Sequence, residues 1–183
     1  MIAELDNLLE KRLSYPEDKN LQQRGLADKI EERCNLIIKQ NFPNVVDPRS
    51  RRSIEDITIG DTYVDHKSSD EALEFKMPNL ISIDRLIHLD RPLVYNFIIY
   101  NSDMKIIVKN FSLNVYELNW DHLSIQNLGK GQLQIKCMKD FLENPKSTMT
   151  KQEWIDKLKV EAIAFYDKLI TKTQDRKSFW MSL

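Results

Sequence analysis

Residues 56–67, DITIGDTYVDHK, constrain the fold more than any other stretch, because they have the pattern of a short β-hairpin. Two runs rich in β-branched and aromatic residues flank Gly60-Asp61, a pair suited to a two-residue turn. Side chains alternate along a strand, so Asp65 and Lys67 share one face of the second strand and His66 lies on the other. We therefore predict that a carboxylate and an ammonium group project side by side.

The hairpin also brings a second carboxylate into reach. Asp56 begins the first strand and would lie opposite or diagonal to Asp65 and Lys67. Carboxylate oxygens bind Mg²⁺, and a lysine can hold a phosphate or polarise a water molecule. The combination indicates metal-assisted hydrolysis of a phosphodiester; a cluster of charges on a solvated face is the alternative. Asp61 is a rival first acid, although its separation from Asp65 is short for a hairpin.

Length and composition bound the class of protein. A chain of 183 residues is long enough for one domain, 1–183, with a continuous core. No apolar run approaches the ~20 residues of a membrane span, and residues 1–13 lack the pattern of a signal peptide, so we expect a cytoplasmic protein that does not contact membranes. Cys34 and Cys137 lack the spacing of a zinc site. With a net charge of −1, any DNA binding must come from local patches.

The remaining segments predict helices around a sheet. From apolar periodicity we predict helices over 2–13, 21–40, 80–87 and 150–172, and strands over 93–100, 104–109, 115–118 and 133–137. Pro78 and Asn79 stand at the start of the third helix, where Asn79 can cap it. Thr150 and Glu153 form a capping box at the start of the last helix. Residues 1–40 thus form a helical N-terminal part ahead of the hairpin.

The hairpin and its flanks resemble the active-site region of a nuclease superfamily. An acid followed nine residues later by Asp-x-Lys, here Asp56 and then Asp65 to Lys67, is similar to the PD-(D/E)xK signature. The sequences RSRRSIED and FKMPNLIS, which complete the segment 49–82, resemble type II restriction endonucleases of the EcoRV and HincII kind, and the HincII branch more closely. The likeness covers the middle third of the chain. His66 stands where the family often has a small apolar residue, and the proline before the first acid is absent.

This resemblance implies an α/β fold, a restriction-endonuclease-like mixed central β-sheet flanked by α-helices, and an activity. The enzyme would be a Mg²⁺-dependent type II restriction endonuclease that cuts double-stranded DNA at a palindromic site as a homodimer and leaves 5′-phosphates. A structure-specific repair or recombination nuclease of the same fold and a non-catalytic DNA-binding domain are the alternatives.

The resemblance also implies roles for individual residues. Asp56 and Asp65 would bind the metal, with the main-chain carbonyl of His66 as a further ligand. Lys67 would orient or help deprotonate the attacking water. In similar nucleases the helix before the hairpin often supplies a third acid, for which Glu31 is the candidate; a glutamate at the rim of the helix is the other interpretation.

Two groups of residues near the hairpin are candidates for DNA contacts. Arg49, Arg51 and Arg52 precede the first acid and would either clamp the DNA backbone or neutralise the acids. Asn79 and Ser82 lie at a predicted helix start, where exposed amide groups attract anions, so they would touch DNA or simply cap the helix.

A third candidate lies within residues 120–137, in a polar loop with two glycines. Asn127, Lys130 and Gln132 are of the types that read purine edges in the major groove, although such a loop can also be a plain turn. For the dimer, the N-terminal leucine stripe and the apolar end Phe179-Trp180-Met181 are candidate surfaces.

Overall fold

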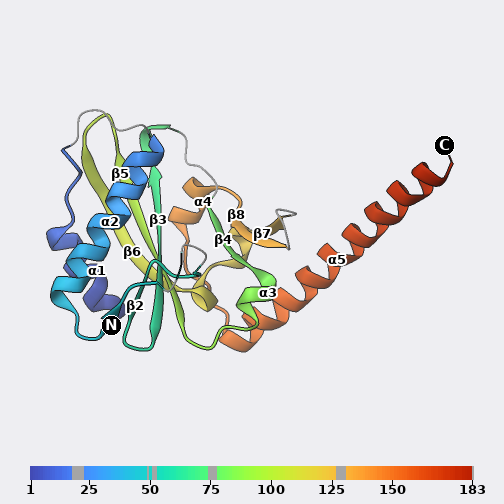
Figure 1. Ribbon diagram of the computed structural model, residues 1–183, viewed down its shortest axis with the longest axis horizontal. Helices are drawn as coiled ribbons and strands as arrows, with labels where there is room; N and C mark the ends of the chain where they lie inside the picture. The colour runs from blue at the N-terminus through green and yellow to red at the C-terminus, as the bar shows by residue number, and fades with distance from the viewer. Residues whose placement is uncertain (18–22, 49, 51–52, 74–77, 127–130, 183) are drawn as a thin grey trace.

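The computed structural model describes residues 1–17, 23–48, 50, 53–73, 78–126 and 131–182, and there the chain is a mixed α/β fold (Figure 1). Its strands are β1 (Val45–Val46), β2 (Ile57–Ile59), β3 (Thr62–Asp70), β4 (Asn79–Ser82), β5 (Leu93–Asn101), β6 (Ile106–Asn114), β7 (Leu123–Gln126) and β8 (Gln132–Ile135). Its α-helices are α1 (Ile2–Arg12), α2 (Gln23–Asn41), α3 (Ile83–Leu86), α4 (Met138–Glu143) and α5 (Lys151–Met181).

Within these residues the strands form two sheets. The larger sheet has the order β1-β2-β3-β5-β6 and is mixed, because β3 and β5 run parallel while its other neighbouring strands are antiparallel. The smaller sheet is antiparallel, with the order β4-β8-β7. The expectation of an α/β fold with a mixed sheet and helices is therefore confirmed.

The predicted hairpin is present as β2 and β3. Ile59 pairs with Thr62 across the turn, and Gly60 has φ +61°, the positive value expected of the first central residue in a Gly-X hairpin turn. Strand β3 then runs beyond the end of β2 and pairs with β5 along its length. Beyond Val64, where Asp65 and Lys67 lie, β3 is paired with β5 on one side, and no strand of the described residues pairs with it on the other.

Helices α1 and α2 cover one face of the larger sheet (Figure 1). Leu5, Leu9 and Leu13 pack there with α2 residues and with Val64 and Ile98 of the sheet. The prediction that the N-terminal leucine stripe supplies a dimer surface is therefore wrong, since the chain's own sheet buries it.

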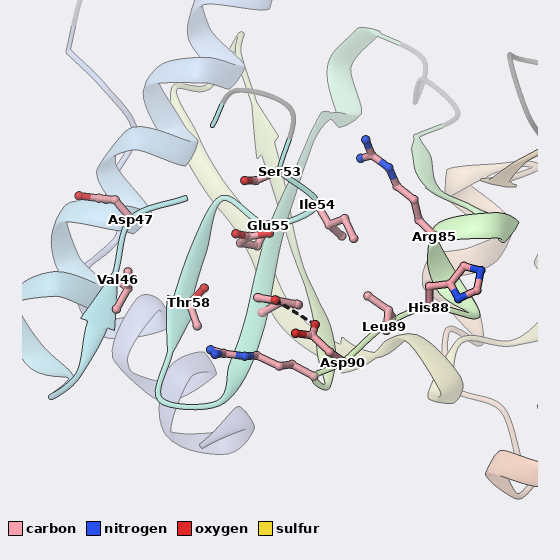
Figure 2. Close-up of a pocket in the computed structure, with 12 residues that line it drawn as sticks. Val46, Asp47, Ser53, Ile54, Glu55, Thr58, Arg85, His88, Leu89 and Asp90 are labelled. Carbon is pink, nitrogen blue, oxygen red and sulfur yellow. Dashed lines mark hydrogen bonds between the residues drawn. The ribbon is translucent and has the colours of Figure 1, made fainter. Parts of the chain in front are cut away.

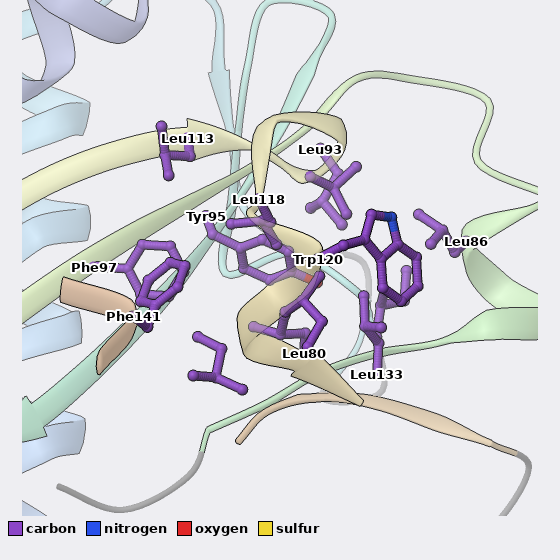
Figure 3. Packing of buried hydrophobic residues seen from close by; sticks show 14 of the residues in the cluster. Leu80, Leu86, Leu93, Tyr95, Phe97, Leu113, Leu118, Trp120, Leu133 and Phe141 are labelled. Carbon is purple, nitrogen blue, oxygen red and sulfur yellow. The ribbon is translucent and has the colours of Figure 1, made fainter. Parts of the chain in front are cut away.

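The opposite face of the larger sheet packs against the smaller sheet and α4 (Figure 3). Tyr95 and Phe97 of β5 lie in one cluster with Leu80 of β4 and Leu133 of β8, and Phe97 also meets Phe141 of α4 with ring centroids 5.1 Å apart. This shared core holds the two sheets at the distance that defines the cleft between them.

Two predicted elements are of a different type in the structure. Asn79–Ser82 is a strand because its backbone pairs with β8, and the helix begins only at Ile83 with Ser82 as its N-cap, whose hydroxyl accepts the Arg85 amide at 3.4 Å. The predicted strand at 115–118 is instead a short 3₁₀ turn, Val115–Glu117, closed by a capping box between Asn114 and Glu117.

Helix α5 begins with the predicted capping box but is longer than the predicted 150–172. It continues to Met181, so residues 173–181 are helical as well. Trp154 and Leu158 are buried, whereas the distal half projects from the body of the molecule (Figure 1). Of the helices in the described ranges, none combines the length and the apolar character needed to cross a membrane.

Candidate active site

A cleft of about 280 Å³ lies between the two sheets and brings together residues from both. Its lining residues are Ser53, Ile54, Asp56, Asp65, Lys67, Leu80, Ile81, Ser82, Arg85 and Gln132. The hairpin supplies the acids and the lysine, and the smaller sheet with α3 supplies the facing side. The three catalytic residues predicted from the hairpin thus share one cleft.

Strand alternation places Asp65 and Lys67 on the face that packs toward the smaller sheet. Lys67 Nζ donates to Asp65 Oδ1 at 2.7 Å and lies 5.8 Å from the centre of the Tyr95 ring. Tyr95 is the register partner of Asp65 on β5, so its buried ring supports both side chains from the sheet. The pair is therefore held on a rigid strand rather than on a loop.

Asp56 is fixed beside this pair by the backbone of β3. Its amide donates to Val64 O at 2.9 Å, and its Oδ2 accepts the His66 amide at 2.7 Å. Asp61, the rival first acid, lies in the exposed turn and does not line the cleft. Of the two candidates for the first acid, Asp56 is thus the one that lines the cleft.

Burial and like charge change the ionisation of two carboxyls. Asp65 is 6% exposed, and burial raises its pKa to about 8, with Lys67 opposing the rise and Asp56 adding to it. Burial likewise raises the pKa of Glu31 to about 7, and the charge of Asp56 contributes. The charge of Asp56 thus raises the pKa of both acids, Glu31 on α2 and Asp65 on β3.

Glu31 reaches β3 from α2, on the side away from the cleft. Its Oε1 accepts the Ser68 hydroxyl at 3.0 Å, and it is not among the residues that line the cleft. The interpretation as a plain rim glutamate is therefore too simple, because the side chain is largely buried and interacts with the first acid. In this conformation Glu31 stands behind the cleft.

The His66 side chain also points toward α2. Its Nδ1 lies 3.0 Å from Asn96 Oδ1 and its Nε2 3.1 Å from Asn35 Oδ1; complete burial lowers its pKa. The imidazole thus anchors the strand to the helix layer. The main-chain N–H and C=O of His66 instead project within the plane of the sheet, toward Asp56, because both groups of a strand residue point to the same side and the N–H donates to Asp56 Oδ2.

The oxygen donors at the cleft suit a hard cation that takes only a few ligands from the protein. Within the described ranges no group of three or more His, Cys, Asp and Glu side chains is arranged to hold a metal. The acidic side chains that line the cleft are those of Asp56 and Asp65, and the His66 carbonyl projects to the same side of β3 as the His66 amide that contacts Asp56. Mg²⁺ in phosphoryl-transfer sites is held by one or two carboxylates, waters and substrate phosphates. A cation beside the two carboxylates would offset the effect of the Asp56 charge, which helps to raise the pKa of Asp65.

The predicted DNA-contacting residues divide into three groups. Ser82 and Gln132 are register partners of β4 and β8, and both line the cleft. Asn79 is exposed outside it and accepts the Gln134 amide at 2.9 Å. The remaining candidates, Arg49, Arg51, Arg52, Asn127 and Lys130, lie outside the described residues.

Five lining residues were not predicted as site residues from the sequence: Ser53, Ile54, Leu80, Ile81 and Arg85. Arg85 follows Ser82 by three residues, so one turn of α3 places the two near each other. A basic residue one turn after a predicted helix start was a signal available in the sequence.

Comparisons of the chain with models of known protein families and with curated proteins found no match. The functional argument therefore depends on the residues of the cleft.

Proposed function

We propose that this protein is a Mg²⁺-dependent type II restriction endonuclease with a restriction-endonuclease-like fold. The observation that carries the proposal is the meeting of Asp56, Asp65 and Lys67 in one cleft that also contains Ser82 and Gln132. The strand pattern and the resemblance select the first three for catalysis, whereas a predicted helix start selects Ser82 and a polar loop selects Gln132 for DNA contact. Residues from segments up to 76 positions apart thus converge on one cavity.

The chemistry assigned to each side chain follows from its position. Asp56 and Asp65, with the His66 carbonyl, would hold Mg²⁺, which when bound supplies positive charge at the scissile phosphate and lowers the pKa of a water. The Lys67 side chain is 21% exposed, and its ammonium group lies beside the Asp65 carboxyl. From this position it can orient the attacking water and donate to a phosphate oxygen. Release of Asp65 from Lys67 upon cation binding would free the ammonium group for this role.

The substrate would be double-stranded DNA with a palindromic site, and the active form a homodimer. One chain with one such cleft cuts one strand, so two chains related by a two-fold axis match a palindrome. The exposed end of α5 is the remaining candidate surface, with exposures of 59% for Phe179, 72% for Trp180 and 77% for Met181. Such a dimer would cut both strands in one binding event.

Digestion of unmethylated phage DNA with Mg²⁺, followed by sequencing of the fragment ends, tests this function. We expect discrete fragments with 5′-phosphates and a common sequence at the ends. Asp56→Ala and Asp65→Ala should abolish cleavage, and Lys67→Ala should lower the rate by orders of magnitude yet still bind DNA in Ca²⁺. Asp61→Ala is the matched control, because this acid lies in the exposed turn.

Two results would contradict the proposal. Random degradation, or no cleavage by excess wild-type protein, would exclude a restriction activity. Cleavage by Asp56→Ala or Asp65→Ala at a rate close to that of the wild type would remove that residue from the site.

A further inference from the structure

The cleft has two walls of different charge. The wall formed by the hairpin carries Asp56, Asp65 and Lys67, and the wall formed by β4, α3 and β8 carries Ser82, Arg85 and Gln132. Lys67 is already paired with Asp65 at 2.7 Å, so the hairpin wall by itself offers no net positive charge to a phosphate. A phosphodiester that enters from solvent therefore needs positive charge from the facing wall as well as from a cation.

We propose that Arg85 binds a backbone phosphate of the substrate from the wall opposite the carboxylates. This inference rests on the proposed function and adds a phosphate-contacting residue to it. A guanidinium group presents several N–H donors in a plane and forms paired hydrogen bonds with phosphate oxygens. Ser82 and Gln132 lie on the same wall and offer a hydroxyl and an amide beside it.

The base of Arg85 is held firmly although its side chain is exposed. Ile83 and Leu86, on either side of it in α3, are buried in the core, and the Ile83 amide donates to Gly131 O at 2.9 Å. Gly131 has φ +75°, and a Cβ there would lie 3.0 Å from Ile83 Cδ1 and 3.1 Å from Phe165 Cε1. This close approach locks α3 against the start of β8, so Arg85 is presented from a rigid position.

Arg85 also lines a second, larger cavity beside the cleft. That cavity, of about 510 Å³, shares Ser53, Ile54 and Arg85 with the cleft. Figure 2 shows the Arg85 side chain extending from α3 toward the segment of Ser53 and Ile54. A polynucleotide is longer than one phosphate, so a strand placed at Asp65 and Lys67 would pass Arg85 on its way into the larger cavity.

Cleavage and binding by Arg85→Ala and Arg85→Lys test this inference, with Arg12→Ala as the matched control. Arg12 is an exposed arginine at the end of α1, on the far side of the sheet. Cleavage of unmethylated phage DNA is measured with Mg²⁺, and binding of fragments of the same DNA is measured with Ca²⁺ over a series of salt concentrations. Thermal unfolding checks that each variant is folded.

For Arg85→Ala we expect affinity to fall by about 10- to 100-fold, as for loss of a charge-assisted hydrogen bond. The slope of log affinity against log salt should become shallower by about one, because one phosphate contact is lost. Arg85→Lys should recover the slope and part of the affinity, since it keeps the charge without the paired geometry. Arg12→Ala should behave like the wild type.

The outcomes separate this inference from the proposed function. If the wild type cuts at discrete sites while Arg85→Ala keeps wild-type affinity or an unchanged salt slope, the Arg85 contact is refuted and the nuclease proposal stands. If the wild-type protein neither binds nor cuts DNA, both are refuted.

Discussion

Replacement of Asp65 by asparagine should stabilise the metal-free protein at alkaline pH. The folded state holds the proton on Asp65 more tightly than the unfolded state does, because burial raises its pKa from 3.8 to about 8. Between these two values the folded state binds more protons, so the free energy of unfolding falls as the pH rises. Above pH 8 the carboxyl is ionised in both states, and the folded state then bears the full cost in stability of keeping a buried, charged Asp65.

The size of the penalty follows from the same values. A rise in pKa from 3.8 to about 8 corresponds to about 6 kcal/mol at pH 9. Water that enters the open cleft reduces this, so we expect Asp65→Asn to raise the free energy of unfolding by about 2–4 kcal/mol. For a chain of this length the midpoint of thermal unfolding would rise by about 5–10 °C. At pH 5.5 about two fifths of this difference should already be present, because the unfolded state has released the proton while the folded state still holds it; the two proteins should be equally stable only below pH 3.8.

Thermal and urea unfolding in EDTA at pH 5.5 and pH 9 measure this difference, with Asp61→Asn as the control in the exposed turn. Mg²⁺ should then stabilise the wild type at pH 9 more than Asp65→Asn, because only the wild type has both carboxylates. If Asp65→Asn is equally or less stable than the wild type at pH 9 in EDTA, the argument from burial is refuted.

Three further predictions concern other parts of the molecule. Asn96 is fully buried and joins His66 to Asn110 and Ser112, so Asn96→Ala should cost about 2–3 kcal/mol in urea unfolding, whereas the exposed Asn79→Ala should cost little. If Gln132 reads a base edge, Gln132→Ala should lose about 1–3 kcal/mol of discrimination between sites; unchanged site preference in competition cleavage would place recognition elsewhere. The wild type should sediment at about twice its chain mass of 21.6 kDa, and Trp180→Ser should favour the monomer because it removes exposed apolar area; a wild-type monomer that accumulates nicked plasmid would contradict the dimer.

Local patterns in the sequence determined the hairpin and the direction of its side chains. The turn at Gly60 and the period of two along a strand depend only on neighbouring residues, and they correctly placed Asp65 and Lys67 on one face and His66 on the other. The capping box of α5 was also predicted, since Thr150 and Glu153 are three residues apart.

Contacts between distant segments decided the rest. Asn79 has the local pattern of a helix cap, but pairing with β8 makes Asn79–Ser82 a strand and transfers the cap to Ser82. The partners of His66, Asn35 and Asn96, lie 31 and 30 residues away, and no periodicity connects them.

The cleft depends on tertiary structure in the same way. Its second wall exists because the core shared by Phe97, Leu80 and Leu133 brings the two sheets together, which is how Arg85 comes to line the cleft with Asp65. The raised pKa of Asp65 has the same origin, because desolvation depends on what the packed chain places around a carboxyl. The sequence thus determined which groups share a strand face. Only the packing of distant segments determined what those groups face and how far burial raises the pKa of Asp65.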